Sequence, residues 1–378
     1  MTNSVDVAVI GGGIVGLAHA WMAARRGLRV VLLERSAAAE GASVRNFGMV
    51  WPIGQPAGDL YDRALRSREL WLELHARGAV AVEECGSIHL AHRPDERAVL
   101  EEFCGLGTHA ARMLPAAAVA DRTPLANPTG LLAGMVSPTE LRVDPRTASA
   151  RIATWLAETF DVNVCFRTTA VDVTDRIVRA ADGRTWRADK VVVCSGSDVL
   201  TLFPDVLARS GLVACKLQML RSAEPPPPNP PAPHLASGLT LRHYASFRAC
   251  SALEAVCARI STETPELDRF GIHVMASPFP NGDVTVGDSH EYGDAVTPFD
   301  KVEIDDLIIR EAGRVFRLTP GAITQRWNGI YMKHPAKPVF EAEPVPGIHV
   351  FIGAGGAGMT MAFGLADRAW LRWTGTSL

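Results

Sequence analysis

A glycine-rich turn near the N-terminus restricts the possible folds of this chain more than any other feature. An apolar run at residues 5–10 leads into Gly11, Gly13 and Gly16, which have the spacing Gly-x-Gly-x-x-Gly, and the next apolar run ends at Glu34. In a strand–turn–helix–strand unit, the first glycine permits a tight turn and the second lets a pyrophosphate approach the backbone. The third allows the helix to pack closely on the strand, and the acid accepts hydrogen bonds from a ribose diol. The pattern therefore predicts a dinucleotide-binding module.

The same region offers an alternative interpretation as a membrane span or a signal peptide. Residues 7–24 are apolar apart from His19, and a run of that length could cross a bilayer. The preceding residues include Asp6 but no Lys or Arg, and three consecutive glycines are poor material for the start of a span. We therefore expect a cytoplasmic chain that does not associate with a membrane.

Composition argues against several other classes of protein. The net charge is −3, from 38 Lys plus Arg and 41 Asp plus Glu, which gives no support for nucleic-acid binding. The 7 cysteines are scattered and form no Cys-x-x-Cys pair, as expected in a reducing compartment. No zinc-site spacing is visible, so no metal is expected.

Two later segments indicate a flavin nucleotide rather than a nicotinamide one. The segment 41–49, GASVRNFGM, places small and polar residues after the ribose acid. Ser43 and Asn46 could bond the phosphate and the edge of a flat ring system there. A second glycine-rich turn, 353–358, opens another helix. The positive end of that helix suits an anionic reduced flavin, although an ordinary turn between a strand and a helix is the alternative.

Hydrophobic periodicity places further elements along the chain. Helices are expected at residues 59–77, 96–103, 146–159, 300–316 and 359–373, and buried strands at 190–194 and 348–352. Asp144 is placed to cap the helix that Pro145 begins. The region 239–297 is interpreted as β-rich, and the proline-rich stretch 225–233 as a surface loop.

Four segments together resemble the D-amino-acid-oxidase superfamily, which includes glycine oxidase and sarcosine oxidase. They read DVAVIGGGIVGLAHAWMAARRGLRVVLLER, GASVRNFG, VVVCSGS and FIGAGGAGMTMAFGLAD. The resemblance implies an α/β fold in which a Rossmann-type FAD-binding domain is joined to a substrate domain with an antiparallel sheet. It also implies that a small amine loses a hydride to the flavin and becomes an imine, which then hydrolyses.

The resemblance also implies domain boundaries and a set of cofactor contacts. The FAD-binding domain is expected at residues 1–82, 140–215 and 321–378, and the substrate domain at 83–139 and 216–320. Val171 is expected to contact the adenine side through its backbone, and Ser195 and Gly196 to lie at the diphosphate. The full set expected to bind FAD is Gly11, Gly13, Ile14, Val15, Gly16, Glu34, Arg35, Ser43, Arg45, Asn46, Gly48, Met49, Val171, Ser195, Gly196, Gly353, Gly355, Gly356, Ala357, Gly358, Met359 and Thr360.

The chain departs from this superfamily in the stretch 326–335, RWNGIYMKHP. Amino-acid oxidases commonly carry an Arg there that clamps a carboxylate in a bidentate manner, and Tyr331 stands in its place. Sarcosine-oxidase relatives carry a flavin-linking Cys in the same stretch, and none is present here. An ordinary α-amino-acid substrate is therefore in doubt, and FAD is expected to be bound non-covalently.

Two further segments resemble a subgroup associated with aminophosphonate breakdown. They are 45–56, RNFGMVWPIGQP, and 241–250, LRHYASFRAC. A phosphonate is a tetrahedral anion. Several separate hydrogen-bond donors bind it better than the planar guanidinium group of a single Arg does. Taken singly, each donor is better explained as a surface or core residue than as a ligand, except Tyr331 and Lys333, for which the two interpretations are balanced. The set expected to bind substrate is Trp51, Gln55, Arg242, His243, Tyr244, His273, Tyr331, Lys333 and His334.

These observations predict an FAD-dependent oxidation of a small amine, with O2 as the oxidant. A dehydrogenase that passes electrons to a carrier, an amino-acid or sarcosine-type oxidase, and a flavoprotein without catalytic activity are the alternatives. No residue is singled out as a general base, and the sequence does not predict an oligomeric state.

Overall fold

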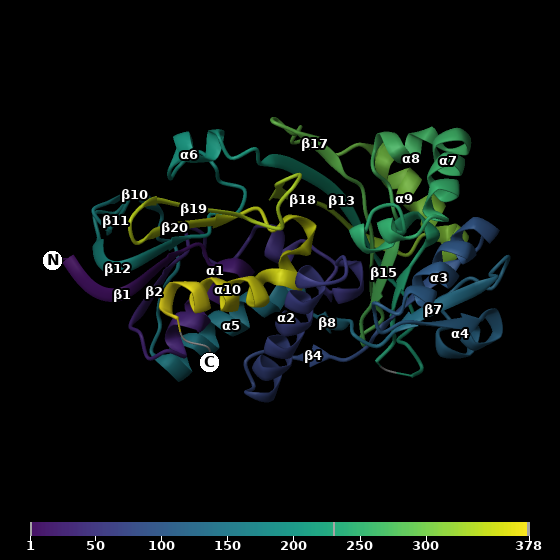
Figure 1. The fold of residues 1–378 in the computed structure, drawn as a ribbon, viewed down its shortest axis with the longest axis horizontal. Helices are drawn as coiled ribbons and strands as arrows, with labels where there is room; N and C mark the ends of the chain where they lie inside the picture. Colours follow the sequence, from purple (N-terminus) through teal and green to yellow (C-terminus); the bar gives the residue numbers. More distant parts are fainter. Residues whose placement is uncertain (1, 230, 376–378) are drawn as a thin grey trace.

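The computed structural model describes residues 2–229 and 231–375, and two large β-sheets lie beside one another in it (Figure 1). The first sheet lies at the left of Figure 1 and carries both the N-terminal strand and the C-terminal helix. The second lies at the right, with its own helices. The arrangement is the α/β fold with a second, largely antiparallel sheet that the sequence predicts.

The first sheet consists of β1 (Thr2–Ile10), β2 (Val30–Leu33), β9 (Asn163–Cys165), β10 (Ala170–Thr174), β11 (Ile177–Ala180), β12 (Thr185–Val193), β19 (Phe340–Val345) and β20 (Ile348–Ile352). Its helices are α1 (Ile14–Ala24), α2 (Asp59–Ala76), α5 (Pro145–Phe160), α6 (Pro204–Ala208) and α10 (Gly358–Thr374). The parallel strands run in the order β9-β2-β1-β12-β20, so β1 lies at the centre of the parallel part.

The second sheet consists of β5 (Ser87–Ala91), β6 (Arg112–Pro115), β7 (Ala133–Ser137), β13 (Val213–Ala223), β14 (His234–Ala236), β15 (Met275–Pro278), β16 (Asp283–Gly287), β17 (Glu291–Gly293) and β18 (Ile323–Lys333). Its helices are α3 (Pro94–Leu106), α4 (Ala116–Arg122), α7 (Leu253–Glu263), α8 (Pro265–Arg269) and α9 (Val302–Val315). A small sheet joins β3 (Met49–Val50), β4 (Val82–Glu83) and β8 (Leu141–Val143). Single turns of 3₁₀ helix are η1 (Ala42–Val44), η2 (Pro52–Gly54), η3 (Gly238–Thr240), η4 (Ala245–Ala249) and η5 (Gly355–Ala357).

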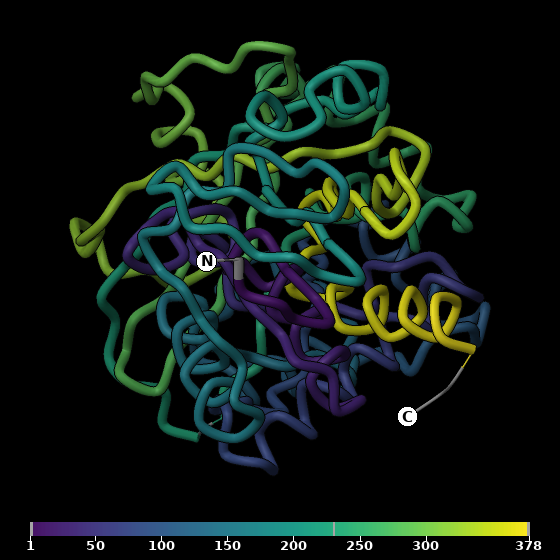
Figure 2. Tube along the Cα trace, turned by 90° about the vertical axis from the view of Figure 1, so that its left-hand side faces the viewer, coloured from purple at the N-terminus to yellow at the C-terminus, as the bar shows by residue number. Residues whose placement is uncertain are grey.

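The apolar stretch near the N-terminus is buried inside the protein. α1 packs against β1 on one side and against α5 and α10 on the others, so nearly every residue from Ile14 to Ala24 is buried. The N-terminal helix α1 and the C-terminal helix α10 thus pack together in one domain, and the purple and yellow segments lie in the same part of the molecule in Figure 2. Among residues 2–229 and 231–375, no helix is both long and apolar enough to cross a membrane.

Most of the expected elements form with small shifts at their ends. β20 has the expected bounds, α10 exceeds them by one residue at each end, and Asp144 caps α5 by accepting a hydrogen bond of 3.0 Å from the Arg146 N–H. The β-rich interpretation of 239–297 was wrong for α7 and α8. Val256 and Ile260, four residues apart, form the buried face of α7, which is helical spacing.

The sheets also bear on the domain boundaries, which stay a prediction. Most strands fall in the segment expected for their sheet. β18 is the exception, because it pairs with β13 in the second sheet although it follows the boundary expected at residue 321.

A buried histidine in α1 predicts a pH-dependent stability. His19 packs against Phe351 and Trp373, with ring centroids 4.5 and 5.5 Å away, and neither ring nitrogen has a hydrogen-bond partner among the described residues. Burial lowers the pKa of His19 from 6.5 to about 3. The folded chain keeps this ring neutral while the unfolded chain protonates it below pH 6.5, so His19 destabilises the fold increasingly as the pH falls toward 3.

We therefore expect His19→Leu to be more stable than the parent protein at low pH. Its advantage in free energy of unfolding should grow by about 1.4 kcal/mol for each pH unit below 6.5. Urea unfolding at pH 7, 6 and 5 measures this difference, and His75→Leu, at an exposed position of α2, is the matched control. A constant difference between His19→Leu and the parent across this range would contradict the assignment.

Candidate cofactor and substrate site

A cavity of about 780 Å³ lies between the two sheets. Its wall includes both glycine-rich turns, the segment around η1, the end of β12 and the last residues of β18. The volume falls within the range of about 300–1,000 Å³ that is typical of ligand pockets. Segments far apart in the sequence therefore meet around one cavity.

The first glycine turn fixes one end of this cavity. Gly11 has φ +107°, and a Cβ atom on it would collide with the carbonyl oxygen of Cys194. A Cβ on Gly16 would likewise collide with the carbonyl oxygen of Gly11. Beside the turn, Glu34 accepts hydrogen bonds from the backbone N–H groups of Gly12 (2.7 Å) and Ser36 (2.9 Å). The N-terminus of α1 and this carboxylate thus both face the cavity, as the dinucleotide motif predicts.

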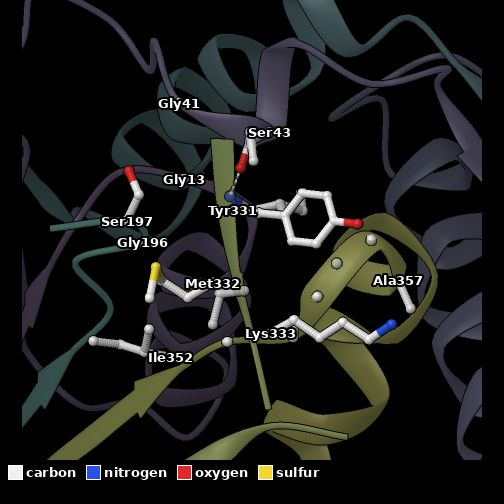
Figure 3. Close-up of a pocket in the computed structure, with 18 of the residues that line it drawn as sticks. Gly13, Gly41, Ser43, Gly196, Ser197, Tyr331, Met332, Lys333, Ile352 and Ala357 are labelled. Atoms are coloured by element: carbon white, nitrogen blue, oxygen red, sulfur yellow. Dashed lines mark hydrogen bonds between the residues drawn. The ribbon is translucent and has the colours of Figure 1, made fainter. Parts of the chain in front are cut away.

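The segment around η1 forms the adjoining wall, although its polar groups are used differently from the prediction. Ser43 Oγ accepts a hydrogen bond of 2.9 Å from the Ile14 N–H at the start of α1 (Figure 3). The Asn46 amide donates to the carbonyl oxygens of Ala42 and Ser43, at 2.9 and 3.0 Å, and accepts from the Gly48 N–H at 2.8 Å. Asn46 lines the cavity, but its amide mainly holds its own loop in shape.

The second glycine turn forms the opposite wall and is tied to the first half of the chain. Thr360 Oγ1 accepts a hydrogen bond of 2.9 Å from the Trp51 N–H. The Met359 carbonyl oxygen accepts one of 2.9 Å from the Trp71 Nε1–H. These bonds hold the N-terminus of α10 beside the η1–η2 region, so both helix N-termini border the same cavity.

β18 brings two of the predicted substrate residues over the second turn. Tyr331 and Lys333 alternate onto one face of the strand and extend toward the turn that carries Ala357 (Figure 3). The Tyr331 hydroxyl lies 3.3 Å from the position a Cβ of Gly356 would occupy. Burial raises the pKa of Tyr331 well above its ordinary value, so its hydroxyl stays a donor. Lys333 Nζ donates to the Tyr292 hydroxyl at 3.3 Å.

Polar residues that the sequence did not single out complete this chamber. Asp288 and His290 line the cavity beside His243, His273 and Tyr244. Asp288 and His290 are two residues apart in an extended segment, with Tyr292 two further on, and such alternation directs side chains to one face. The alternation in the fragment DSHEY is therefore a sequence feature that indicates this wall, although the predicted set of site residues does not include it.

Most of the predicted site residues line the cavity, and three do not. Gly48, Val171 and Arg242 are absent from the wall. Val171 is 42% exposed on β10, and its neighbour Ala170 lines the cavity instead. The Arg242 guanidinium donates to the Ile272 carbonyl oxygen at 2.8 Å. It therefore binds the backbone next to His273, which lines the cavity, without lining the cavity itself.

His334 lines the cavity in a different role from the predicted one. It follows the end of β18 and does not share the Tyr331–Lys333 face. Its Nδ1 accepts hydrogen bonds of 3.0 Å from the N–H groups of Ala336 and Lys337. His334 therefore stabilises the turn after β18.

The wall fits FAD in several independent respects. Two helix N-termini face a cavity of ligand size, and glycines at both turns leave the backbone accessible. Glu34 sits where a ribose diol would need an acceptor, and the end of β12 borders the same region through Ser195 and Gly196. These residues could hold the nucleotide half of FAD at one end and the flavin half near β18.

Comparison with known proteins identifies the family. Residues 6–369 match the DAO family, FAD dependent oxidoreductase, and the chain therefore belongs to that family. The fold is similar to glycine oxidase from Bacillus cereus, with a TM-score of 0.76, 18% identity and coverage of 98% of this chain and 95% of that one. Glycine oxidase from Geobacillus kaustophilus has a TM-score of 0.76 and 19% identity, and the match covers 100% of this chain and 97% of that one. Iminodiacetate oxidase from Chelativorans sp. BNC1 has a TM-score of 0.72 and 19% identity, and the match covers 98% of this chain and 95% of that one.

One curated relative matches in sequence over a short segment. A D-amino-acid oxidase from Streptomyces coelicolor is 41% identical over 73 residues, which is 19% of this chain and 23% of the relative. The match is too short to carry the relative's activity over to this chain.

Removing the ribose acceptor should weaken cofactor binding. We expect Glu34→Ala to lower FAD affinity about ten- to a hundredfold, since a hydrogen bond to a charged group contributes about 1.5–3 kcal/mol. Titration of the cofactor-free chain with FAD, followed by flavin fluorescence, measures the affinity. Glu254→Ala, at an exposed position of α7, is the control, and equal affinities in the two variants would show that Glu34 does not contact the cofactor.

Proposed function

We propose that this protein oxidises the C–N bond of a small amine that carries a phosphonate group. Candidate substrates are 2-aminoethylphosphonate and its N-methyl form. FAD supplies the two-electron acceptor for this chemistry when bound. The single observation that carries the proposal is the chamber wall on β18, where Tyr331 and Lys333 lie on the same face. The family resemblance leads one to expect a carboxylate-clamping Arg at the position of Tyr331.

The amine part of the proposal is supported by the family and by the neighbours in fold. The structural relatives include proteins named glycine oxidase, iminodiacetate oxidase and L-proline dehydrogenase. Each of these names includes a compound that carries an amino or imino group. In this chain the second sheet borders the cavity, and a small amine bound there could reach the flavin half of the cofactor.

The phosphonate part is supported by the donors in the chamber. A tetrahedral oxyanion is best held by several separate donors, whereas a planar carboxylate matches the fork of one Arg. Tyr331 remains a neutral donor because burial raises its pKa, and Lys333 offers a positive charge beside it.

The reaction balances with O2 as the terminal oxidant. The substrate loses one hydrogen from carbon with its electron pair and one proton from nitrogen, which gives an imine. Water then adds to the imine, and the products are an aldehyde and ammonia, or methylamine from the N-methyl substrate. O2 takes up the two electrons and two protons as H2O2. The chain's part is to bind and orient the substrate and to exclude bulk water.

FAD is proposed to be held without a covalent link. Of the described residues that line the cavity, Cys194 is the one cysteine, and it is buried at the end of β12 behind the first glycine turn. We expect acid precipitation to leave the yellow flavin in the supernatant. Flavin retained in the protein pellet would contradict this expectation.

A substrate panel tests the proposed class directly. We expect higher kcat/KM for 2-aminoethylphosphonate or its N-methyl form than for glycine, sarcosine or D-amino acids, measured by peroxide release. Anaerobic bleaching of the flavin by the same compounds tests the alternative of a dehydrogenase. In a dehydrogenase the amine would bleach the flavin, but no peroxide would be released in air. Preference for an α-amino carboxylate would show that the substrate class is wrong, and no bleaching by any amine would favour a flavoprotein without this activity.

Lys333 provides a second test of the anion site. We expect Lys333→Met to raise KM for the phosphonate about ten- to a hundredfold, because a charge-assisted hydrogen bond contributes about 1.5–3 kcal/mol. The kcat should change much less, since the lost binding is common to the ground state and the transition state. Lys190→Met, on β12 and outside the cavity wall, is the control, and parent-like kinetics of Lys333→Met would place the anion elsewhere in the chamber.

A further inference from the structure

Three histidines from separate segments of the second sheet meet in the chamber wall. His243 follows η3, His273 precedes β15 and His290 precedes β17. Their ring centroids are 4.1, 4.4 and 5.1 Å apart. One ring nitrogen of each lies within 4.8 Å of the others. Imidazoles that share a tetrahedral zinc ion have centroids about 5 Å apart, given Zn–N distances of about 2.0–2.1 Å. The rings therefore already have nearly the separation that a shared ion requires.

One of these rings is oriented in the way that metal-binding histidines are, and a second lies beside a carboxylate. His290 Nδ1 lies 3.2 Å from the Gly271 carbonyl oxygen. His273 Nε2 lies 3.0 Å from Asp288 Oδ1, although this contact lacks the geometry of a hydrogen bond. Metal-binding histidines almost always donate their second N–H to a carboxylate or a backbone carbonyl, which fixes the tautomer and leaves the other lone pair for the ion. His273 Nδ1 is buried and has no hydrogen-bond partner among the described residues.

Two of the three rings are almost completely buried. His273 is 2% and His290 7% exposed, and the His273 Nδ1 lone pair has no hydrogen-bond partner among the described residues. An unpaired buried polar group is unfavourable, and a bound ion would offset that penalty.

Two cations lie near the histidines, and each has a partner of its own. Arg242 forms an ion pair with Asp268, with 3.2 Å between Nη1 and Oδ1. Lys333 donates to the Tyr292 hydroxyl. The Asp288 carboxyl group, 4% exposed and in contact with His273, supplies the compensating negative charge once an ion binds. The local charges therefore permit a divalent ion.

We propose that His243, His273 and His290 bind a divalent first-row transition-metal ion and that Asp288 orients His273. Imidazole ligands suit zinc, copper, nickel and iron. Three protein ligands leave a coordination position open toward the chamber. An anionic oxygen of the substrate would take that position. This last role rests on the proposed function, whereas binding of the ion does not.

Metal content of the holoenzyme tests the site. The FAD-loaded chain is prepared with an affinity tag that contains no histidine, stripped with dipicolinate, and titrated with Zn²⁺ against a chromophoric chelator. We expect one saturable Zn²⁺ site per FAD in the parent. His273→Gln and His290→Gln should lose that site, and Asp288→Asn should weaken it about ten- to a hundredfold, as outer-shell changes do. His75→Gln, at an exposed position of α2, is the matched control and should bind as the parent does.

The outcomes separate this site from the proposed function. Flavin absorbance of each variant reports whether the fold and cofactor are retained. Absence of saturable Zn²⁺ binding in the parent, or equal binding in His273→Gln, overturns the metal site whatever the turnover. Stoichiometric binding without amine turnover supports the site and counts against the proposed function. Methylphosphonate, followed by its perturbation of the flavin spectrum, should bind at least tenfold more tightly with Zn²⁺ than without. Equal affinity for methylphosphonate with and without Zn²⁺ would show that the ion does not help to hold the anion.

Discussion

The close approach of three backbone segments at the first glycine turn supports the rest of the structure. α1 begins so near β1 that a Cβ on Gly16 would strike the carbonyl oxygen of Gly11, and Gly11 itself lies against the end of β12 at Cys194. A methyl group at either glycine would push α1 away from the sheet. α5 and α10 pack on α1, so this contact also sets their positions. The unpaired N–H groups of the first turn of α1 are thereby held at the cavity wall.

The second constraint is the connection of the two ends of the chain across the cavity. The hydrogen bonds from Trp51 to Thr360 and from Trp71 to Met359 join residues about 300 positions apart and hold the start of α10 against the η1–η2 region. β18 then passes directly over this turn, as the contact between Tyr331 and Gly356 shows. A cofactor that meets both helix N-termini would lie under the face of β18 that carries the substrate donors.

The polar groups of the chamber set the chemistry that it can support. Several of them are buried with few protein partners, including His273 and Asp288. A buried polar group without a partner destabilises a fold by about 1–3 kcal/mol, so a cluster of them indicates a site that a ligand completes. Tyr331 and Lys333 offer donors, whereas the histidines offer lone pairs. The chamber therefore presents hydrogen-bond donors beside a group of imidazole lone pairs.

The sequence by itself determined the cofactor module, because its signals are local. Gly11, Gly16 and Glu34 act through backbone geometry within one strand–helix–strand unit. The turn before α10 is likewise a glycine-rich connection between a strand and a helix. The helix α7 was missed although its pattern is also local, because its short apolar repeat was interpreted as strand. Only the tertiary structure decided the chamber. His243, His273 and His290 come from different loops, and their meeting depends on strand pairing and register in the second sheet, which single-chain patterns do not encode. The same packing turned Arg242 away from the cavity toward Asp268 and left Asn46 occupied with its own loop.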